Sequence, residues 1–247
     1  MKIIFLLAAL ALAAGEVTMK PVKTFPGGSP QVLDFFRDGK KTGSAALNEL
    51  GVSLKTTGVI PDGTAREYYP SGKLRLEAVY KNGKKNGKMK AYYAQGRLMT
   101  SAFIKNDLCE GPSATYYEDG KLAREINCKR GQWHGLCKTY SPKGVLSADE
   151  RYADGRLSGV SRFYDEKGKL KEERSYENSL RSGPSKVFYP DGSVQVEINF
   201  KRDVPDGSAK SYFTGGKLMY EDSFKDGRQL SRKAYNKKGK LLYETRY

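Results

Sequence analysis

"GTAREYYPSGKLRLEAVYKNGKKN" occupies residues 63–86, and the 24 residues that follow it, "GKMKAYYAQGRLMTSAFIKNDLCE", repeat its plan. Steps of 24 residues place a glycine at the start of seven successive repeats: Gly63, Gly87, Gly111, Gly135, Gly159, Gly183 and Gly207. A second glycine follows nine residues later in each: Gly72, Gly96, Gly120, Gly144, Gly168, Gly192 and Gly216. Two glycine columns without a slip indicate an internal repeat.

Each repeat contains two β segments. In the first repeat "AREYY" (65–69) leads through "PSGK" into "LRLEAVY" (74–80), and "KNGKKN" leads to the next repeat. Aromatic and alternating residues bounded by Gly, Asn and Pro are typical of strands and hairpins. Helices are disfavoured because glycines at these intervals leave no uninterrupted helix of useful length. Alternation puts the apolar side chains of 74–80 on one face and a mixed set on the other.

Two segments of the repeat resemble a known family. They are the "YY-x-x-G-K-L" core (Tyr68, Tyr69, Gly72, Lys73, Leu74) and the "Y-K-N-G-K-x-x-G" turn from Tyr80 to Gly87. The repeats resemble the MORN (membrane occupation and recognition nexus) repeat, and more closely its variant in bacterial YwqK-like proteins, which are regarded as antitoxins of toxin–antitoxin systems. This resemblance implies one curved antiparallel sheet of stacked hairpins and no catalytic chemistry. We therefore predict an all-β fold, a repeat array of 24-residue β-hairpins that forms an elongated, curved antiparallel meander sheet.

The N-terminal residues 1–15, "MKIIFLLAALALAAG", predict a secretory signal peptide. Lys2 precedes an apolar run from Ile3 to Leu12, small residues follow, and the run is too short to span a bilayer as a mature helix. Cleavage after Ala13 or Gly15 fits this pattern. The alternative, a buried N-terminal helix, is disfavoured because no polar face interrupts the run.

The rest of the chain divides by its repeat content. Residues 16–42 are expected to be an irregular segment, 43–62 a degenerate repeat, and 63–247 an array of seven full repeats and a partial eighth. No later stretch is apolar enough to cross a membrane. We therefore expect an exported protein of the periplasm, the cell envelope or the extracellular space, without a transmembrane segment in its mature form.

The formal net charge of +16 predicts an anionic partner. Acidic proteins, lipid headgroups and anionic envelope polymers are candidates, whereas export argues against nucleic acid as the physiological target. Surplus positive charge is expected in turns such as "KNGKK" (81–85), which makes Lys81, Lys84 and Lys85 candidate binding residues.

Stacked repeats place equivalent residues in columns. Position 4 is mostly basic and position 15 mostly acidic, so that Glu77 is expected opposite Lys90 in a ladder of cross-strand ion pairs. An aromatic column shares this charged face: Tyr68, Tyr92, Tyr116, Tyr140, Tyr164, Phe188 and Tyr212. The column either packs between neighbouring hairpins or binds a peptide, a glycan or an anionic polymer.

"CKRGQWHGLC" (128–137) holds the only Trp, the only His and two of the three Cys. In register with the other repeats it is a hairpin turn. A metal site is disfavoured because two Cys and one His give three ligands rather than four, and a catalytic Cys–His pair lacks an orienting third residue. A disulfide between Cys128 and Cys137 is compatible with an oxidising compartment and would leave Cys109 unpaired.

The sequence thus favours a non-enzymatic exported scaffold that binds a protein or an anionic envelope polymer and needs no cofactor. Peripheral binding to an anionic membrane surface is the alternative, and an enzyme is disfavoured because the chain has one His and no paired-carboxylate motif outside the periodic Glu column.

Overall fold

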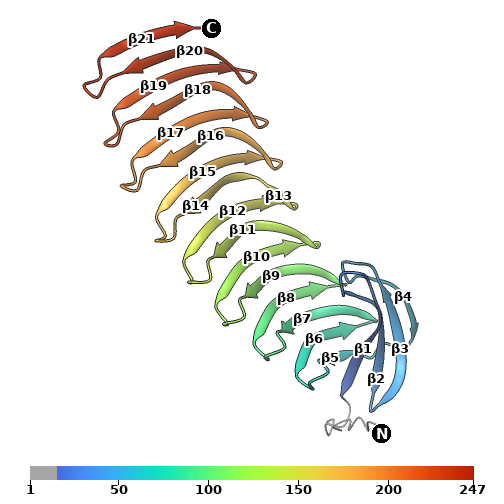
Figure 1. Cartoon of the computed structure of the whole chain (residues 1–247). Helices are drawn as coiled ribbons and strands as arrows, with labels where there is room; N and C mark the ends of the chain where they lie inside the picture. The colour runs from blue at the N-terminus through green and yellow to red at the C-terminus, as the bar shows by residue number, and fades with distance from the viewer. Residues whose placement is uncertain (1–15) are drawn as a thin grey trace, which may run out of the picture. The chain divides into compact units, whose positions relative to one another are not determined.

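The computed structural model describes residues 16–247, whose strands are drawn in Figure 1. These residues divide into two compact units. Unit 1 ends at Gly120, and unit 2 comprises Lys121–Tyr247. The predicted signal peptide and both of its cleavage sites lie outside the described residues. Within 16–247 all regular elements are β-strands, and no helix is long and apolar enough to cross a membrane.

Unit 1 begins with a four-stranded meander that we call the cap. Its strands are β1 (Val17–Thr24), β2 (Pro30–Arg37), β3 (Lys40–Leu47) and β4 (Ser53–Gly58), each antiparallel to the next. β1 also pairs in parallel with β5 (Gly63–Tyr68), where Val17 lies opposite Ala65. The cap therefore joins the edge of the first repeat by backbone hydrogen bonds.

The repeats of unit 1 continue from β5 as an antiparallel meander. Its further strands are β6 (Leu74–Lys81), β7 (Lys84–Tyr92), β8 (Leu98–Lys105) and β9 (Leu108–Tyr116). The strand order across unit 1 is therefore β4-β3-β2-β1-β5-β6-β7-β8-β9.

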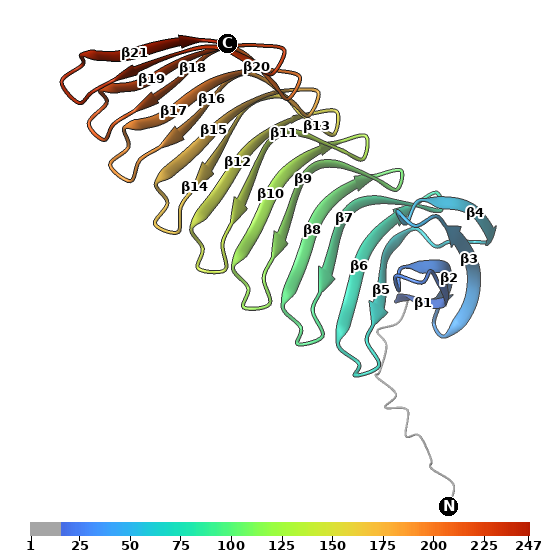
Figure 2. The ribbon, with the colours of Figure 1, turned by 45° about the horizontal axis from the view of Figure 1, so that its top comes forward.

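Unit 2 is also an antiparallel meander, but it has no cap, and its consecutive strands lie side by side (Figure 2). They are β10 (Leu122–Lys129), β11 (Gln132–Tyr140), β12 (Leu146–Ala153), β13 (Arg156–Leu157), β14 (Gly159–Tyr164), β15 (Leu170–Glu177), β16 (Leu180–Phe188), β17 (Val194–Lys201), β18 (Val204–Tyr212), β19 (Leu218–Lys225), β20 (Arg228–Tyr235) and β21 (Leu241–Arg246). Two strands per repeat with antiparallel neighbours confirm the predicted all-β array of hairpins.

Two kinds of turn alternate along the repeats. Between β6 and β7 the chain turns at Asn82 and Gly83, with φ of 51° and 74°, which is the type I′ geometry that matches the twist of the flanking strands. Between β5 and β6 a five-residue turn runs from Tyr69 to Lys73, closed by Gly72 N donating to Tyr69 O (2.8 Å). Gly72 has a φ of 81°, which explains the second glycine column.

The cap covers one face of the first repeats, so the expectation that residues 16–42 are irregular is wrong. Alternating apolar residues of β1 and β2, among them Met19 and Phe35, point into a core shared with Ala65, Ala78 and Tyr80. The rings of Phe35 and Tyr80 meet edge to face at 5.0 Å, and Phe35 is 0% exposed. Burial of this alternating face explains why the segment forms strands.

The segment 43–62, expected to be a degenerate repeat, forms part of the cap. β3 begins at Lys40, and the β3–β4 hairpin brings the backbone close around Gly43, where an added Cβ would lie 2.7 Å from the carbonyl oxygens of Thr57 and Val59. Only glycine fits such an approach without displacing the chain.

Candidate functional site

The outer face of the sheet, which carries Arg66 and Glu77, holds the predicted charge ladder. In unit 1 Glu77 lies opposite both Arg66 and Lys90, and Arg66 Nε donates to Glu77 Oε2 at 3.0 Å. In unit 2 charges of alternating sign are successive cross-strand neighbours: Glu125, Lys138, Asp149, Arg162, Glu173, Lys186, Glu197, Lys210, Glu221, Lys233 and Glu244. The predicted ladder is confirmed, and it balances its own charge.

The seven predicted aromatic residues at Tyr68 and its equivalents are half-buried. Tyr140 Oη donates to Glu125 Oε1 at 3.0 Å, and Tyr164 Oη lies 3.5 Å from Asp149 Oδ2, so both hydroxyls are tied to the ladder. Tyr68 Oη donates to Glu16 Oε1 at 2.5 Å. Burial, followed by this hydrogen bond, raises the pKa of Tyr68 to about 12. Tyr140 and Tyr164 thus contact a neighbouring repeat, and Tyr68 contacts the residue before β1.

In three repeats the residue after this aromatic is a tyrosine that connects one repeat to the next. The hydroxyls of Tyr69, Tyr93 and Tyr189 each donate, at 2.7 Å, to the backbone carbonyl of the residue 23 positions later. Where the column has Asp165 instead, its Oδ1 accepts from the amides of Lys167 (2.8 Å) and Lys169 (2.9 Å) and closes its own turn. This second column is structural.

The three candidate lysines differ from one another in the structure. Lys81 and Lys84 are exposed and lie opposite each other at the β6–β7 turn. Lys85 is half-buried, and its Nζ donates to Gly51 O of the cap at 2.8 Å. Burial lowers the pKa of Lys85, partly offset by the carboxylate of Asp107. Lys85 thus holds the cap, and only Lys81 and Lys84 remain as free surface charge.

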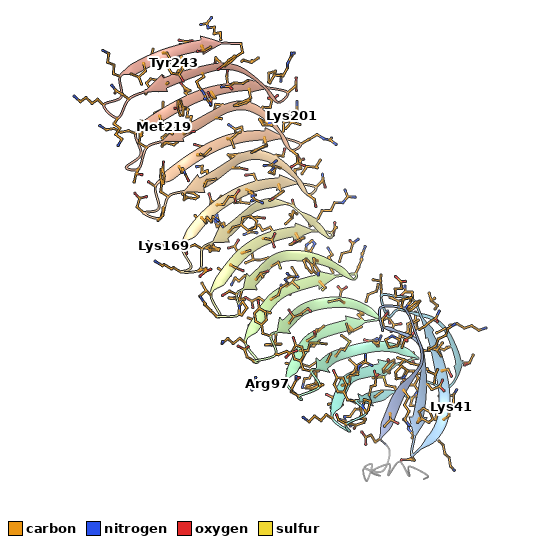
Figure 3. The ribbon with its side chains drawn as sticks, viewed as in Figure 1. Lys41, Arg97, Lys169, Lys201, Met219 and Tyr243 are labelled. Atoms are coloured by element: carbon orange, nitrogen blue, oxygen red, sulfur yellow. The ribbon has the colours of Figure 1, made fainter. Side chains whose placement is uncertain are left out.

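In unit 2, lysines in or beside the turns lie at both edges of the sheet. Figure 3 shows Lys169 at one edge, where the five-residue turns lie, and Lys201 at the opposite edge, beside a type I′ turn. Lys169 Nζ donates to Pro190 O at 2.9 Å, so this side chain reaches the next turn of the same edge.

The stretch 128–137 is a hairpin turn, as predicted: Arg130 and Gly131, with φ of 51° and 79°, connect β10 to β11. Cys137 is a buried free thiol, whereas Cys109 and Cys128 are in disulfide form. The Cys128–Cys137 bridge that the sequence left open, with Cys109 unpaired, is therefore not formed. The register explains this, because Cys128 lies opposite Trp133 and Cys137 lies opposite Glu150.

No group of three or more His, Cys, Asp or Glu side chains in residues 16–247 is placed to hold a metal ion. His134 Nδ1 lies 3.5 Å from Asp154 Oδ1, beside the next turn.

The inner face, which carries Ala65, Ala78 and Tyr80 in unit 1, is the surface on which the two units differ. Under the cap Tyr80 is 3% exposed. Its aromatic equivalents in unit 2 are half-buried, and no described element of unit 2 lies over them: Tyr152, Tyr176, Phe200 and Phe224. A row of aromatic rings left open on one face of a sheet is typical of a binding surface.

Arginines accompany these aromatic rings. The guanidinium groups of Arg124, Arg174 and Arg181 lie 5.1, 4.7 and 4.0 Å from the ring centroids of Trp133, Phe163 and Phe200. Trp133 also meets Tyr152 edge to face at 5.1 Å. Beside Arg174, the hydroxyls of Ser161 and Ser185 are buried without a hydrogen-bond partner in the described chain.

The aromatic column predicted as a binding site lies on the outer face, and the sequence-based prediction did not include this inner surface. The sequence does contain a pattern that indicates it, because aromatic residues recur at the Tyr80 position of five repeats. Apolar residues on one face of a strand, however, normally indicate that this face is buried. No pattern within the repeats indicates which of them the cap covers.

The fold defines the class as a β-repeat protein built from successive antiparallel hairpins. Five segments match the family model of the MORN repeat variant: residues 61–82, 110–129, 157–178, 181–202 and 205–226. These five segments are therefore similar to the MORN repeat variant, in agreement with the resemblance seen in the sequence.

No curated protein matches the chain. Among solved structures it is similar to a TcdB2–TccC3 complex, at 12% identity and a TM-score of 0.22 over 92% of this chain and 17% of that one. It is also similar to a Tc holotoxin pore from Photorhabdus luminescens, at 10% identity and a TM-score of 0.20 over 93% of this chain and 16% of that one. The chain thus spans about a sixth of the length of these structures.

Proposed function

We propose that this protein is an exported, non-enzymatic repeat scaffold that binds a partner protein on the inner face of unit 2. One observation carries the proposal. The Tyr80 position, which the cap buries in unit 1, recurs in unit 2 as four half-buried aromatic residues that no described element of unit 2 covers: Tyr152, Tyr176, Phe200 and Phe224. If the partner is a toxin, the protein would act as its antitoxin, as in the YwqK-like proteins that the repeats resemble.

The position of the aromatic residues favours the inner face over the predicted Tyr column on the outer face. Outer hydroxyls such as those of Tyr140 and Tyr164 already have carboxylate partners within the ladder. The inner rings are instead flanked by arginines and small side chains, a combination frequent at interface hot spots. Binding to an anionic envelope polymer or membrane would use the exposed turn lysines at the edges of the sheet instead.

A photo-crosslinking experiment tests the proposal and separates the two faces. A photoreactive phenylalanine analogue replaces Tyr176 on the inner face or, as the matched control, Tyr164 on the outer face. Both positions are half-buried tyrosines of the same repeat. We expect a discrete protein adduct from position 176 in cells and none from position 164. Adducts from position 164 alone would move the site to the outer Tyr column.

Vesicles test the membrane alternative. Sedimentation of the protein with anionic vesicles, abolished by salt, without any protein adduct at position 176, would contradict the proposal and favour peripheral membrane binding.

A further inference from the structure

The cap shows which kind of chain segment the inner face accepts. Three side chains of the first repeats contact or pack against it: Leu76 packs against the cap core, Tyr80 Oη reaches Met19 Sδ at 3.8 Å, and Lys85 holds Gly51. The cap meets them with extended strands whose large apolar side chains alternate, such as Phe35 against Tyr80. An extended polypeptide is therefore complementary to this face.

The equivalent positions in unit 2 carry a cation at a different place on the inner face. In the 24-residue register, Leu76 becomes Arg124, Lys85 becomes Trp133, and Tyr80 becomes Tyr152 one repeat further on. These three side chains lie together, because Arg124 stacks over Trp133 and Trp133 contacts Tyr152. An arriving segment would therefore meet an arginine where the cap meets a leucine.

Arg124 differs from the other inner-face arginines in its partners. Arg174 is held by Glu172 through two hydrogen bonds (2.6 and 2.8 Å), and Arg232 is held by Asp222 in the same way (2.8 and 2.9 Å). Arg124 donates from Nε to Thr139 Oγ1 at 3.3 Å, and no carboxylate of residues 16–247 lies within 4.0 Å of its nitrogens. Glu150, on the same face of β12, attracts Arg124 through space without a direct ion pair. The terminal nitrogens of Arg124 therefore make no direct contact with a carboxylate of the described chain and can donate to one from a ligand.

We infer that the inner face of β10–β12 binds an extended acidic segment of a partner protein. A carboxylate of the segment pairs with the terminal nitrogens of Arg124, and a neighbouring apolar side chain packs on Trp133 and Tyr152. This inference rests on the proposed function and names the chemistry of the partner. An arginine oriented by an aromatic ring is well suited to a carboxylate, because its planar donor fork makes charge-assisted hydrogen bonds.

Trp133 provides a direct measurement, since it is the only Trp in the chain. The probe is a nine-residue peptide of Ser and Thr with one Phe and two Glu, and the matched peptide has Gln in place of Glu. We expect the Glu peptide to change Trp133 emission in a saturable titration, with an affinity roughly tenfold or more above that of the Gln peptide. A peptide held elsewhere by the net positive charge would leave the emission unchanged.

Matched variants separate the pairing from general attraction. Arg124→Gln should remove the preference for the Glu peptide, and Arg124→Lys should retain part of it. Arg151→Gln makes the same charge change on the exposed outer face, opposite Leu136, and should leave both affinities unchanged within about twofold. Thermal unfolding of each variant verifies folding, and if Arg124→Gln unfolds, Arg124→Lys and the two peptides still decide the question.

Three results would overturn the inference. Equal affinities for the Glu and Gln peptides would show that Arg124 does not recognise a carboxylate. Equal losses of affinity for the Glu peptide in Arg124→Gln and Arg151→Gln would show that only the net positive charge attracts the peptide. A response to acidic oligosaccharides but to neither peptide would assign the face to glycans. If adducts at position 176 persist in any of these cases, the scaffold function stands and only the partner chemistry fails; if they are absent, the proposed function fails too.

Discussion

At the scale of single residues, the glycine that begins each repeat has a backbone role and, in some repeats, a steric one. Gly87 has a φ of +136°, and an added Cβ would lie 2.9 Å from Val79 Cβ. Gly63 has a φ of +112°, but nothing lies within 4 Å of an added Cβ. Both glycines have a positive φ, but only at Gly87 would an added Cβ collide with a neighbouring side chain.

Gly63→Ala should lower the free energy of unfolding by about 1–2 kcal/mol, because the alanine is held at positive φ. Gly87→Ala should lower it by roughly a further 1–3 kcal/mol, because Val79 must also move. Denaturant titration of both variants measures the difference. Equal losses would show that the contact with Val79 costs nothing.

Tyr68 predicts a pH dependence at the alkaline end. Its folded pKa of about 12 exceeds the ordinary 10.0, so the fold favours the neutral phenol. The stabilisation is complete below the unfolded pKa and is lost as the pH rises toward 12. Stability measured between pH 9 and pH 12 should fall less steeply in Tyr68→Phe than in the parent.

At neutral pH Tyr68→Phe should cost about 1 kcal/mol, the net contribution of a hydrogen bond. The control is Tyr92→Phe in the same column, since the Tyr92 hydroxyl has no partner among the described residues. An identical alkaline profile in the parent and Tyr68→Phe would contradict the assignment of the shift to this hydroxyl.

At the scale of elements, the hairpins are linked at both of their turns. Tyr93 Oη reaches Tyr116 O at 2.7 Å near the five-residue turns, and Asp203 Oδ1 accepts the Arg181 amide at 2.9 Å near the type I′ turns. A sheet with one layer has no second layer that fixes the register of its hairpins. These contacts between neighbouring repeats therefore help to fix the register.

The cap is the one element that gives the sheet a second layer in unit 1, and Phe35 is its buried centre. Phe35→Ala should lower the free energy of unfolding by about 3–5 kcal/mol, the cost of truncating a buried aromatic residue. Phe36→Ala is the matched control, because the neighbouring ring points to the other side of β2 and is only half-buried. Equal losses in equilibrium unfolding would mean that the cap core is not what stabilises unit 1.

At the scale of the whole molecule, stability is expected to be distributed by neighbourhood, because each repeat contacts mainly the repeats beside it. Phe35→Ala should therefore accelerate amide hydrogen exchange in β1–β6 and leave β14–β19 unchanged. Exchange followed by mass spectrometry distinguishes the two regions. A uniform acceleration through residue 247 would show that the chain unfolds as one cooperative body.

The structure of the whole molecule also shows where the positive charges behind the net charge of +16 lie. The outer ladder of unit 2 alternates in sign, and two inner arginines of unit 2 are paired with carboxylates, so surplus charge is left to the turns and to side chains such as Arg124. Local arrangement rather than the total charge then decides where an anionic partner binds.

The sequence by itself determined the repeat, its two strands, its turns and the register of the charge ladder. These follow from contacts between neighbouring residues and adjacent strands: Gly72 and Gly83 set the turns, and the alternation of 74–80 sets the faces. The tertiary structure alone decided that residues 16–58 form a cap and that Cys128 lies opposite Trp133 rather than Cys137. It also decided that Arg124, Trp133 and Tyr152 meet on a face with no cover in unit 2. The physical reason is that burial depends on which distant segment lies over a face, and the periodicity of a repeat carries no information about a segment outside the repeat.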